Sequence, residues 1–289
     1  MPGQNLRPLC HDPLGESVCP SPHLVVRCAL CVKLPDELEF VELLVCLQRY
    51  CLKLPMKKSE KVTGIDWAAI FRNLETWREK ALAVPQAEDT AVTTIAEDYE
   101  EGPAKPWAVL VSTVLSLRTK DEVTRTASRR LLEKAPDPAA LLALGIKETA
   151  RLAYPAGFYH TKAANLAKIA AILLEQYSGQ VPADMDALLS LPGVGRKTAN
   201  LVITEAFDMY GICVDTHVHR ICNRCGWLET LSPEKTEMRL REILPKRYWK
   251  RINRILVLYG QNVCKPISPF CSHCVISEHC RRAGVERSR

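Results

Sequence analysis

The spacing of apolar residues predicts helices along nearly the whole chain after residue 65. Residues 67–83 give the clearest case, because their apolar side chains recur every three to four positions. Asp66, a residue type that favours the helix N-cap, precedes this segment, and Pro85 follows its end. We therefore expect a helix with defined ends here.

The rest of the chain repeats this pattern. Residues 105–134 predict two helices that meet at a break over 118–120, with Asp121 as the cap of the second. A short β-like run is confined to GICVD, residues 211–215, so the predicted class is all-α. Further helices are expected over 138–144, 147–153, 160–177, 183–190, 197–207, 233–244 and 248–261, and from the residue after Asp215.

Residues 1–60 follow a different pattern, with recurring prolines and weak periodicity. We interpret them as a poorly ordered N-terminal extension, and Met56 is a candidate for the true start of the protein. The pair Cys28-x-x-Cys31 has the spacing of half a zinc site, but no second pair completes it.

Composition narrows the class of protein. The chain has 289 residues, of which 47% are hydrophobic and 25% charged, as in globular proteins that bury a core. Its apolar runs stay shorter than the roughly 20 residues of a membrane helix, and it shows no signal peptide. We expect a soluble intracellular monomer with no membrane partner, in the cytoplasm or nucleoid if the source is prokaryotic.

Positive charge is concentrated near the C-terminus. The formal net charge is +6, but residues 239–289 alone carry +9, which leaves −3 for the rest. A basic segment suits a phosphate-backbone partner, since neutralised phosphates release counterions. A solvated basic tail explains the charge equally well.

Four of the 13 cysteines form a compact group with the spacing C-x6-C-x2-C-x5-C: Cys264, Cys271, Cys274 and Cys280. Zinc ribbons usually use two separated C-x-x-C pairs, whereas closely spaced cysteines are typical ligands of a [4Fe–4S] cluster. The spacing therefore favours the cluster over zinc. Cys213, Cys222 and Cys225 are better explained as small core residues.

The segment LPGVGRKTAN, residues 191–200, joins two predicted helices. Gly193 and Gly195 permit backbone conformations that other residues resist, and they leave backbone amides uncovered at a helix N-terminus. Such a turn can grip a DNA phosphate without reading bases, as in a helix-hairpin-helix motif. The alternative is a tight connection between packed helices.

Lys197 and Asp215 are the candidate catalytic residues. Lys197 falls in the first turn of a helix, where the helix dipole disfavours a cation and makes the free amine, a good nucleophile toward electrophilic carbon, more available. An ordinary phosphate contact is the alternative. Asp215 is either an N-cap, a carboxylate that activates the nucleophile, or both. His217 and His219 are two residues apart, so they cannot share a helix face as metal ligands; we expect one packed and one exposed.

Residues 66–285 resemble the endonuclease III family of DNA glycosylases, on the strength of LPGVGRKTAN, VDTHVHRICNR and the four-cysteine loop in this order. The resemblance implies a two-lobed helix-hairpin-helix glycosylase fold, with DNA between a six-helix barrel and an iron–sulfur lobe. It assigns 99–209 to the barrel, with the helix-hairpin-helix over 188–205, and 66–98 plus 210–289 to the other lobe. Lys197 and Asp215 would be catalytic, and the four cysteines would hold the [4Fe–4S] cluster.

The resemblance also implies the chemistry. A damaged base in duplex DNA is flipped out, Lys197 attacks the sugar C1′, and the resulting Schiff base allows β-elimination 3′ to the abasic site. The substrates would be oxidised pyrimidines and abasic sites. The implied DNA contacts are Arg118, Gly193, Val194, Gly195, Arg196 and Thr198.

One position departs from the family pattern. Ser116-Leu117-Arg118-Thr119 stands where the family usually has Ser-x-Gln-Thr, whose glutamine fills the hole left by the flipped base. Arg118 can fill the hole by stacking or hydrogen bonding, or it can contact a phosphate.

Two other functions compete with this reading. A monofunctional mismatch glycosylase would release the base without strand cleavage, and the related adenine-mismatch enzymes lack the nucleophilic lysine. A non-catalytic iron–sulfur DNA-binding protein would keep the turn and the cluster but need neither Lys197 nor Asp215.

Overall fold

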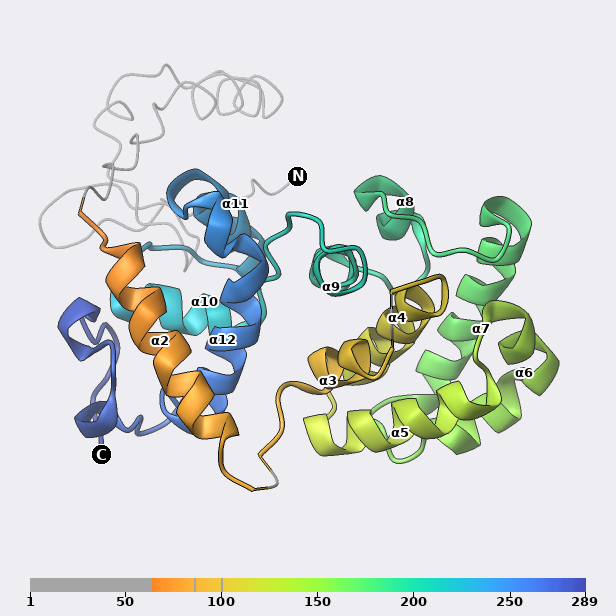
Figure 1. Cartoon of the computed structure of the whole chain (residues 1–289), viewed down its shortest axis with the longest axis horizontal. Helices are drawn as coiled ribbons and strands as arrows, with labels where there is room; N and C mark the ends of the chain where they lie inside the picture. Colours follow the sequence, from red (N-terminus) through yellow and green to blue (C-terminus); the bar gives the residue numbers. More distant parts are fainter. Residues whose placement is uncertain (1–63, 86, 100) are drawn as a thin grey trace, which may run out of the picture. The chain divides into compact units, whose positions relative to one another are not determined.

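A computed structural model describes residues 64–85, 87–99 and 101–289. The interpretations placed on residues 1–60, including the Met56 start and the Cys28-x-x-Cys31 pair, lie outside the described residues. Within the described part, every regular element is helical (Figure 1), which confirms the all-α class. The α-helices are α2 (Trp67–Leu82), α3 (Ala91–Glu97), α4 (Ala104–Ser116), α5 (Asp121–Lys134), α6 (Pro138–Ala153), α7 (Tyr159–Tyr177), α8 (Met185–Ser190), α9 (Arg196–Ala206), α10 (Thr216–Cys225), α11 (Pro233–Ile243) and α12 (Trp249–Asn262). Short 3-10 turns are η1 (Lys246–Tyr248), η2 (Cys271–His273) and η3 (Ser277–His279).

Local signals place most helix ends where the sequence predicts them. The Asp66 carboxylate accepts a hydrogen bond from the Ala69 amide and starts α2. Residues 138–144 and 147–153 form two helical segments, as predicted, and α6 covers both; they are separated by a kink at Gly145, whose φ of 78° is not helical. Asp121 is the first residue of α5 and does not cap it; its carboxylate instead accepts a hydrogen bond from Gln261.

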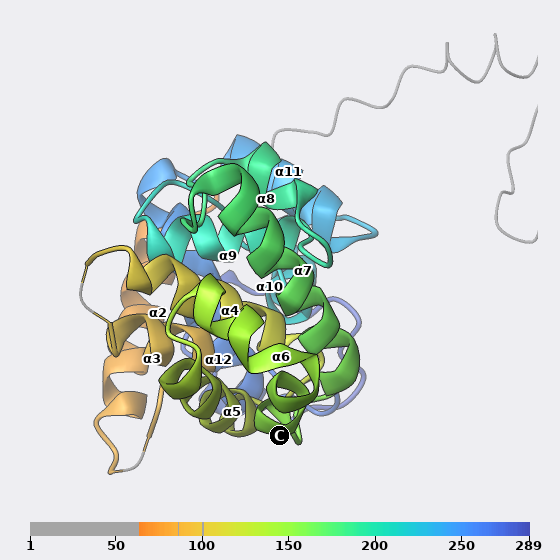
Figure 2. The same cartoon turned by 90° about the vertical axis from the view of Figure 1, so that its right-hand side faces the viewer.

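Two separate hydrophobic cores organise the described helices. The first is built by α3 to α9, around fully buried side chains such as Trp107, Leu110 and Leu166. Figure 2 looks onto this group, with α6 and α7 packed side by side. The second core is built by α2, α10, α11 and α12, which lie together in Figure 1, around residues such as Phe71 and Tyr259.

The helix α3 is a finding that the apolar spacing does not predict. Its buried residues Val92, Ile95 and Ala96 belong to the first core, because α3 packs on α4 and α5. The last helix of the range 66–98 thus packs in the first core. The proposed division into lobes stays a prediction.

The β-like run 211–215 is extended backbone that forms no strand with the described residues. Its side chains nevertheless alternate: Ile212 and Val214 enter the second core, whereas Cys213 enters the first. The alternating pattern arises because this segment runs between two cores. It links α9 to α10 and so sets the spacing between the residues that these helices carry.

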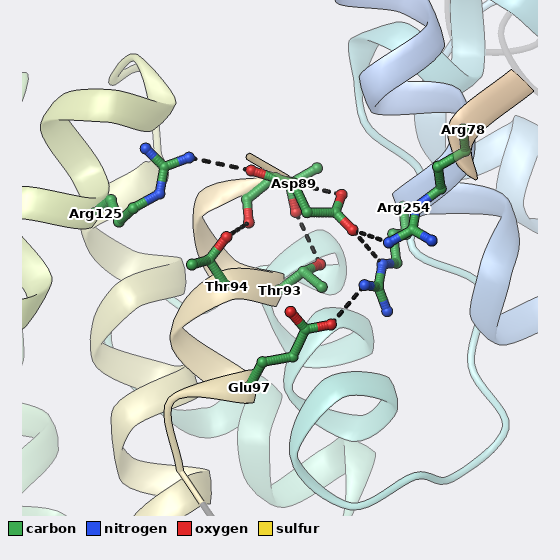
Figure 3. Close-up of polar contacts among 8 residues, drawn as sticks. Arg78, Asp89, Thr93, Thr94, Glu97, Arg125 and Arg254 are labelled. Atoms are coloured by element: carbon green, nitrogen blue, oxygen red, sulfur yellow. Dashed lines mark hydrogen bonds and ion pairs between the residues drawn. The ribbon is translucent and has the colours of Figure 1, made fainter. Parts of the chain in front are cut away.

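A network of ion pairs around Asp89 joins the two helix groups (Figure 3). The buried Asp89 carboxylate accepts hydrogen bonds from Arg78 on α2 and from Arg254 on α12, the latter at 2.5 Å. Arg254 also pairs with Glu97 of α3 at 2.5 Å, and Arg125 donates to the Asp89 carbonyl at 3.1 Å. Asp89 thus ties α2 and α12 to α3 and α5.

Among the described helices, none combines the length and the apolar character needed to cross a membrane.

Candidate active site and DNA-binding turn

The turn between α8 and α9 is anchored by its apolar residues and open at its glycines. Leu191 and Val194 are buried in the first core, and the Val194 amide donates to the Leu191 carbonyl at 3.1 Å. Gly193, which lies between them, and Gly195, which follows Val194, are exposed. Gly193 has a φ of 78°, and a side chain there would approach Asn165 to 2.6 Å, so both conformation and space require glycine.

The N-terminus of α9 is left open by this turn. Gly195 occupies the N-cap position without a side-chain hydrogen bond, and the first turn contains no acidic residue. The first amides of a helix have no partner within the helix and carry its positive dipole end. The turn therefore presents uncapped N–H groups where an anion such as a phosphate can bind.

Lys197 lies in this first turn of α9 and is half-buried. Its carbonyl accepts a hydrogen bond from the Cys213 thiol at 3.6 Å. This bond ties the start of α9 to residues 211–215, the crossing segment between the two cores. Burial lowers the pKa of His217, while the Asp215 charge raises that pKa and the Lys197 charge lowers it. Burial raises the pKa of the Cys213 thiol. The Lys197 charge lowers this pKa, and the Asp215 charge raises it further. Lys197 and Asp215 are thus electrostatic neighbours of the same two side chains.

Asp215 caps α10, as its place before the helix predicts. One carboxylate oxygen accepts hydrogen bonds from the amides of His217 at 2.8 Å and Val218 at 2.9 Å. The carboxylate is half-buried, and its second oxygen remains able to accept further bonds. The cap fixes the direction of the carboxylate without consuming its charge.

His217 and His219 do not divide into one packed and one exposed residue, because both are partly buried. His217 lies against Gly260, where a side chain would meet its Nδ1 at 2.5 Å, and its Nδ1 bonds Arg220 at 3.1 Å. His219 shares a hydrogen bond of 2.7 Å with the Thr236 hydroxyl. The two rings serve packing between α10 and its neighbours.

Arg196, a predicted DNA contact, is held by a buried acid on α11. Its guanidinium donates to both carboxylate oxygens of Glu237, at 2.9 and 2.6 Å, and Glu237 has a side chain only 3% exposed. Burial raises the pKa of Glu237, but hydrogen bonds from Arg196 and Arg241 lower it further, so the net pKa lies below the usual value. Glu237 therefore stays charged at neutral pH and ties α9 to α11 beside Lys197.

Thr198 and Val194, two further predicted DNA contacts, have buried side chains. Thr198 is 1% exposed and Val194 is also buried, so their side chains do not face a ligand. Arg118, in contrast, is exposed. It lies in the loop between α4 and α5, far in the sequence from the turn between α8 and α9. Its backbone adopts a φ of 52°, a left-handed conformation uncommon for a residue with a side chain.

Phe158 is a candidate that sequence reasoning missed. It is 64% exposed, has a φ of 57°, and its ring lies 5.6 Å from the Arg118 guanidinium. The amide of Gly157 donates to the Thr119 hydroxyl at 3.0 Å and fastens the two loops to each other. No local pattern announces the pair, because 40 residues separate Arg118 from Phe158 in the sequence.

The four cysteines of the C-terminal loop line one cavity. Arg224 donates to the Cys264 sulfur at 3.3 Å, the Tyr259 hydroxyl to the Cys274 sulfur at 3.2 Å, and the Arg282 amide to the Cys280 sulfur at 3.3 Å. Hydrogen bonds to cysteine sulfurs are typical of iron–sulfur sites. Cys213, Cys222 and Cys225 are buried core residues, as predicted.

This arrangement fits a group that spans a cavity better than a single ion. Within the described residues, no three His, Cys, Asp or Glu side chains converge closely enough to hold one metal ion. A zinc ion would need its four sulfurs at about 2.3 Å from one point. Four cysteines distributed around one cavity, with donors already aimed at three of the sulfurs, suit a larger cluster.

Comparisons with known proteins agree with this geometry. Residues 111–246 match the family described as HhH-GPD superfamily base excision DNA repair protein. The chain is similar to endonuclease III of Thermotoga maritima, with 45% identity over 62% of this chain and 85% of that protein. It is also similar to endonuclease III-like protein 1 of Bos taurus, with 36% identity over 75% of this chain and 72% of that protein. Among solved structures, a trapped endonuclease III–DNA covalent intermediate superposes with a TM-score of 0.62 and 32% identity, over 74% of this chain and 95% of that one.

Proposed function

The chain belongs to the endonuclease III family of HhH-GPD base excision DNA repair proteins, and we propose that it removes oxidised pyrimidines from duplex DNA and then cuts the strand at the abasic site. It is a DNA glycosylase and AP lyase in this account. The observation that carries the proposal is that Lys197 lies in the uncapped first turn of α9, while its charge and that of the capping Asp215 carboxylate act on the same side chain, His217.

The turn between α8 and α9 and the two loops that carry Arg118 and Phe158 hold the DNA. The open amides around Gly193 and Gly195 bind a phosphate of the damaged strand, at the positive end of α9. Arg118 and Phe158 enter the duplex and occupy the space of the flipped nucleotide, since stacked guanidinium and aromatic groups can replace a base in the stack. The cost of unstacking, a few kcal/mol, is lowest at a lesion.

Lys197 then performs the chemistry with Asp215. The neutral amine forms a bond to C1′ of the sugar, and the glycosidic bond breaks with its electron pair leaving on the base, which takes up a proton. The Asp215 carboxylate stabilises the positive charge that develops on the sugar and accepts the proton that the amine loses.

The lyase step begins when the ring bond between C1′ and O4′ breaks: O4′ leaves with the electron pair and takes up a proton as a hydroxyl, and the bond between C1′ and the Lys197 nitrogen becomes an imine. The Schiff base nitrogen withdraws electrons, so a C2′ proton is lost and the C3′–O bond breaks, which leaves the 3′ phosphate oxygen on the departing strand end. Water hydrolyses the imine and restores the Lys197 amine. One residue thus serves both reactions.

Cys264, Cys271, Cys274 and Cys280 would hold a [4Fe–4S] cluster, with Arg224, Tyr259 and the Arg282 amide as donors to the sulfurs. When bound, such a cluster supplies a covalent tie for the loop and an electron-transfer centre. In this proposal the protein acts as a monomer. Because its substrate is duplex DNA, it works where the cell keeps its DNA.

A cleavage assay separates the candidate functions. The wild-type protein and Lys197→Gln are incubated with labelled duplexes that carry an oxidised pyrimidine, a deaminated base, an abasic site or no lesion, and Lys168→Gln, an exposed lysine on α7, is the control. We expect the wild type and the control to release the oxidised base and cut the strand without alkali, and Lys197→Gln to do neither. Base release that needs alkali for strand cleavage would indicate the monofunctional enzyme, and no base release from any duplex would refute the proposal.

A further inference from the structure

Lys162 on α7 is a buried lysine remote from Lys197 in the sequence. It is 5% exposed, and burial is the cause that lowers the pKa of its amine to about 8. The amine is therefore still protonated at neutral pH. A buried ammonium is costly unless each N–H finds an acceptor. Lys162 meets this requirement without a carboxylate partner among the described residues.

All three acceptors of Lys162 surround Arg118. The Lys162 ammonium donates to the Leu115 carbonyl at 2.7 Å, to the Leu117 carbonyl at 2.6 Å and to the Thr119 hydroxyl at 2.8 Å. The first two lie at the C-terminal end of α4, where carbonyls lack partners within the helix. The three donors of an ammonium are thus fully used on the residues that flank Arg118.

The Thr119 hydroxyl completes the frame. It accepts from Lys162 and from the Gly157 amide at 3.0 Å, and it donates to the Leu117 carbonyl at 3.3 Å, so its hydrogen-bonding capacity is filled. Gly157 must be glycine, because a side chain there would lie 2.5 Å from the Arg118 carbonyl oxygen. Lys162, Thr119 and Gly157 together connect the loop of Arg118 to the loop of Phe158.

Arg118 needs this frame because its backbone conformation is unfavourable. A φ of 52° is disfavoured for any residue with a Cβ atom, and such conformations persist where the surroundings over-determine them. Phe158, at a φ of 57°, is in the same situation. Without the Lys162 bonds, the Leu115 carbonyl loses this donor and the Leu117 carbonyl keeps only the bond from the Thr119 hydroxyl, so the loop 117–119 can relax away from this shape.

We propose that Lys162 is a positioning residue, which holds loop 117–119 so that Arg118 and Phe158 meet the DNA as a wedge already built in the free protein. This inference rests on the proposed function, in which the wedge enters the duplex. Its effect belongs to base flipping from duplex DNA, because a preformed wedge spares the DNA-binding step the cost of ordering the loop. The bond that Lys197 forms to an accessible sugar does not depend on it.

Two DNA substrates isolate that step. A duplex with an oxidised pyrimidine requires flipping, whereas a single-stranded oligonucleotide with an abasic site does not. Lys162→Met keeps the side-chain length and removes the donors, and Lys168→Met on the same helix is the exposed control. We expect Lys162→Met to lower kcat/KM on the duplex about 10- to 100-fold, and to leave borohydride trapping on the single strand within about twofold of the wild type. The control should match the wild type on both.

A double-mutant cycle with Arg118→Ala separates positioning from general support of the fold. In the Arg118→Ala background, Lys162→Met should lower kcat/KM on the duplex only a little further, because both substitutions disable the same wedge. If Lys162→Met does not fold, Thr119→Val removes one bridge at similar volume and should give the same pattern in milder form. Equal losses on both substrates, additive losses in the cycle, or no loss on the duplex would each overturn the inference. A wild type inactive on every substrate would instead refute the proposed function.

Discussion

Asp215 caps α10, and we propose that the same side chain also takes part in the chemistry. Its carboxylate accepts hydrogen bonds from two backbone amides at the start of α10, and its charge, like that of Lys197, shifts the pKa of His217. The sequence allowed both readings, and the geometry is compatible with both at once. Separating them requires a substitution that keeps the cap and removes the charge.

Asp215→Asn and Asp215→Ala provide this separation. Asparagine caps a helix about as well as aspartate, so Asp215→Asn should change the free energy of unfolding by less than about 0.5 kcal/mol, whereas Asp215→Ala should lose about 1–2 kcal/mol. Both should slow base release at least about 100-fold, because both remove the stabilising charge. Urea unfolding and single-turnover base release measure the two effects. Full activity in Asp215→Asn would show that the residue is a cap alone.

Glu205 on α9 gives a prediction about pH. Burial raises the pKa of its carboxyl to about 7, with the Arg254 charge opposing and the Asp89 and Glu97 charges reinforcing the shift. The folded state therefore binds the proton more tightly than the unfolded state, whose pKa is 4.5. Stability from this group is present below pH 4.5 and is lost as the pH rises toward 7.

Glu205→Gln should remove that loss. At about pH 5 the variant and the wild type should have similar free energies of unfolding, and at about pH 8 the variant should be more stable by about 1–3 kcal/mol. Urea unfolding of both proteins at the two pH values is the measurement. A stability difference that stays the same at both pH values would contradict the prediction.

At the scale of elements, local signals explain what the sequence could predict. Asp66 and Asp215 cap helices as expected, and α7 ends at Tyr177 just before Gly179. The helix α3 escaped prediction because seven residues form a stable helix mainly through packing, which the sequence does not reveal. Residues 211–215 have the alternating pattern of a strand because their side chains enter the two cores in turn.

The turn between α8 and α9 can be tested with a matched pair of substitutions. Gly193→Ala forces a side chain into a φ of 78° and against Asn165, whereas Gly195 has a φ of −96° and free space around it. Gly193→Ala should therefore destabilise the protein by about 1–3 kcal/mol and weaken binding to abasic duplex DNA.

Gly195→Ala should change stability by less than about 1 kcal/mol. Fluorescence anisotropy in the Lys197→Gln background measures binding without turnover, and urea unfolding measures stability. Equal effects of the two substitutions would show that the turn conformation is not what matters.

At the scale of the whole described molecule, the proposed catalytic pair, Lys197 and Asp215, depends on the junction between two cores. Lys197 stands on α9 of the first core, and Asp215 begins α10 of the second. The crossing segment, the Glu237 pairs and the Asp89 network hold this junction. The sequence pointed to Lys197 and Asp215 because their motifs are local. It could not point to the pairing of Arg196 with Glu237 or of Asp89 with Arg254, because the partners lie 41 and 165 residues apart.

The central claim is that the Lys197 amine bonds to deoxyribose, and trapping of the adduct tests it most directly. The protein is mixed with abasic duplex DNA and sodium borohydride, and the cross-linked peptide is identified by mass spectrometry. We predict one adduct, on Lys197, that is lost in Lys197→Gln although this variant still binds the duplex. An adduct on another residue, or trapping that persists in Lys197→Gln, would contradict it.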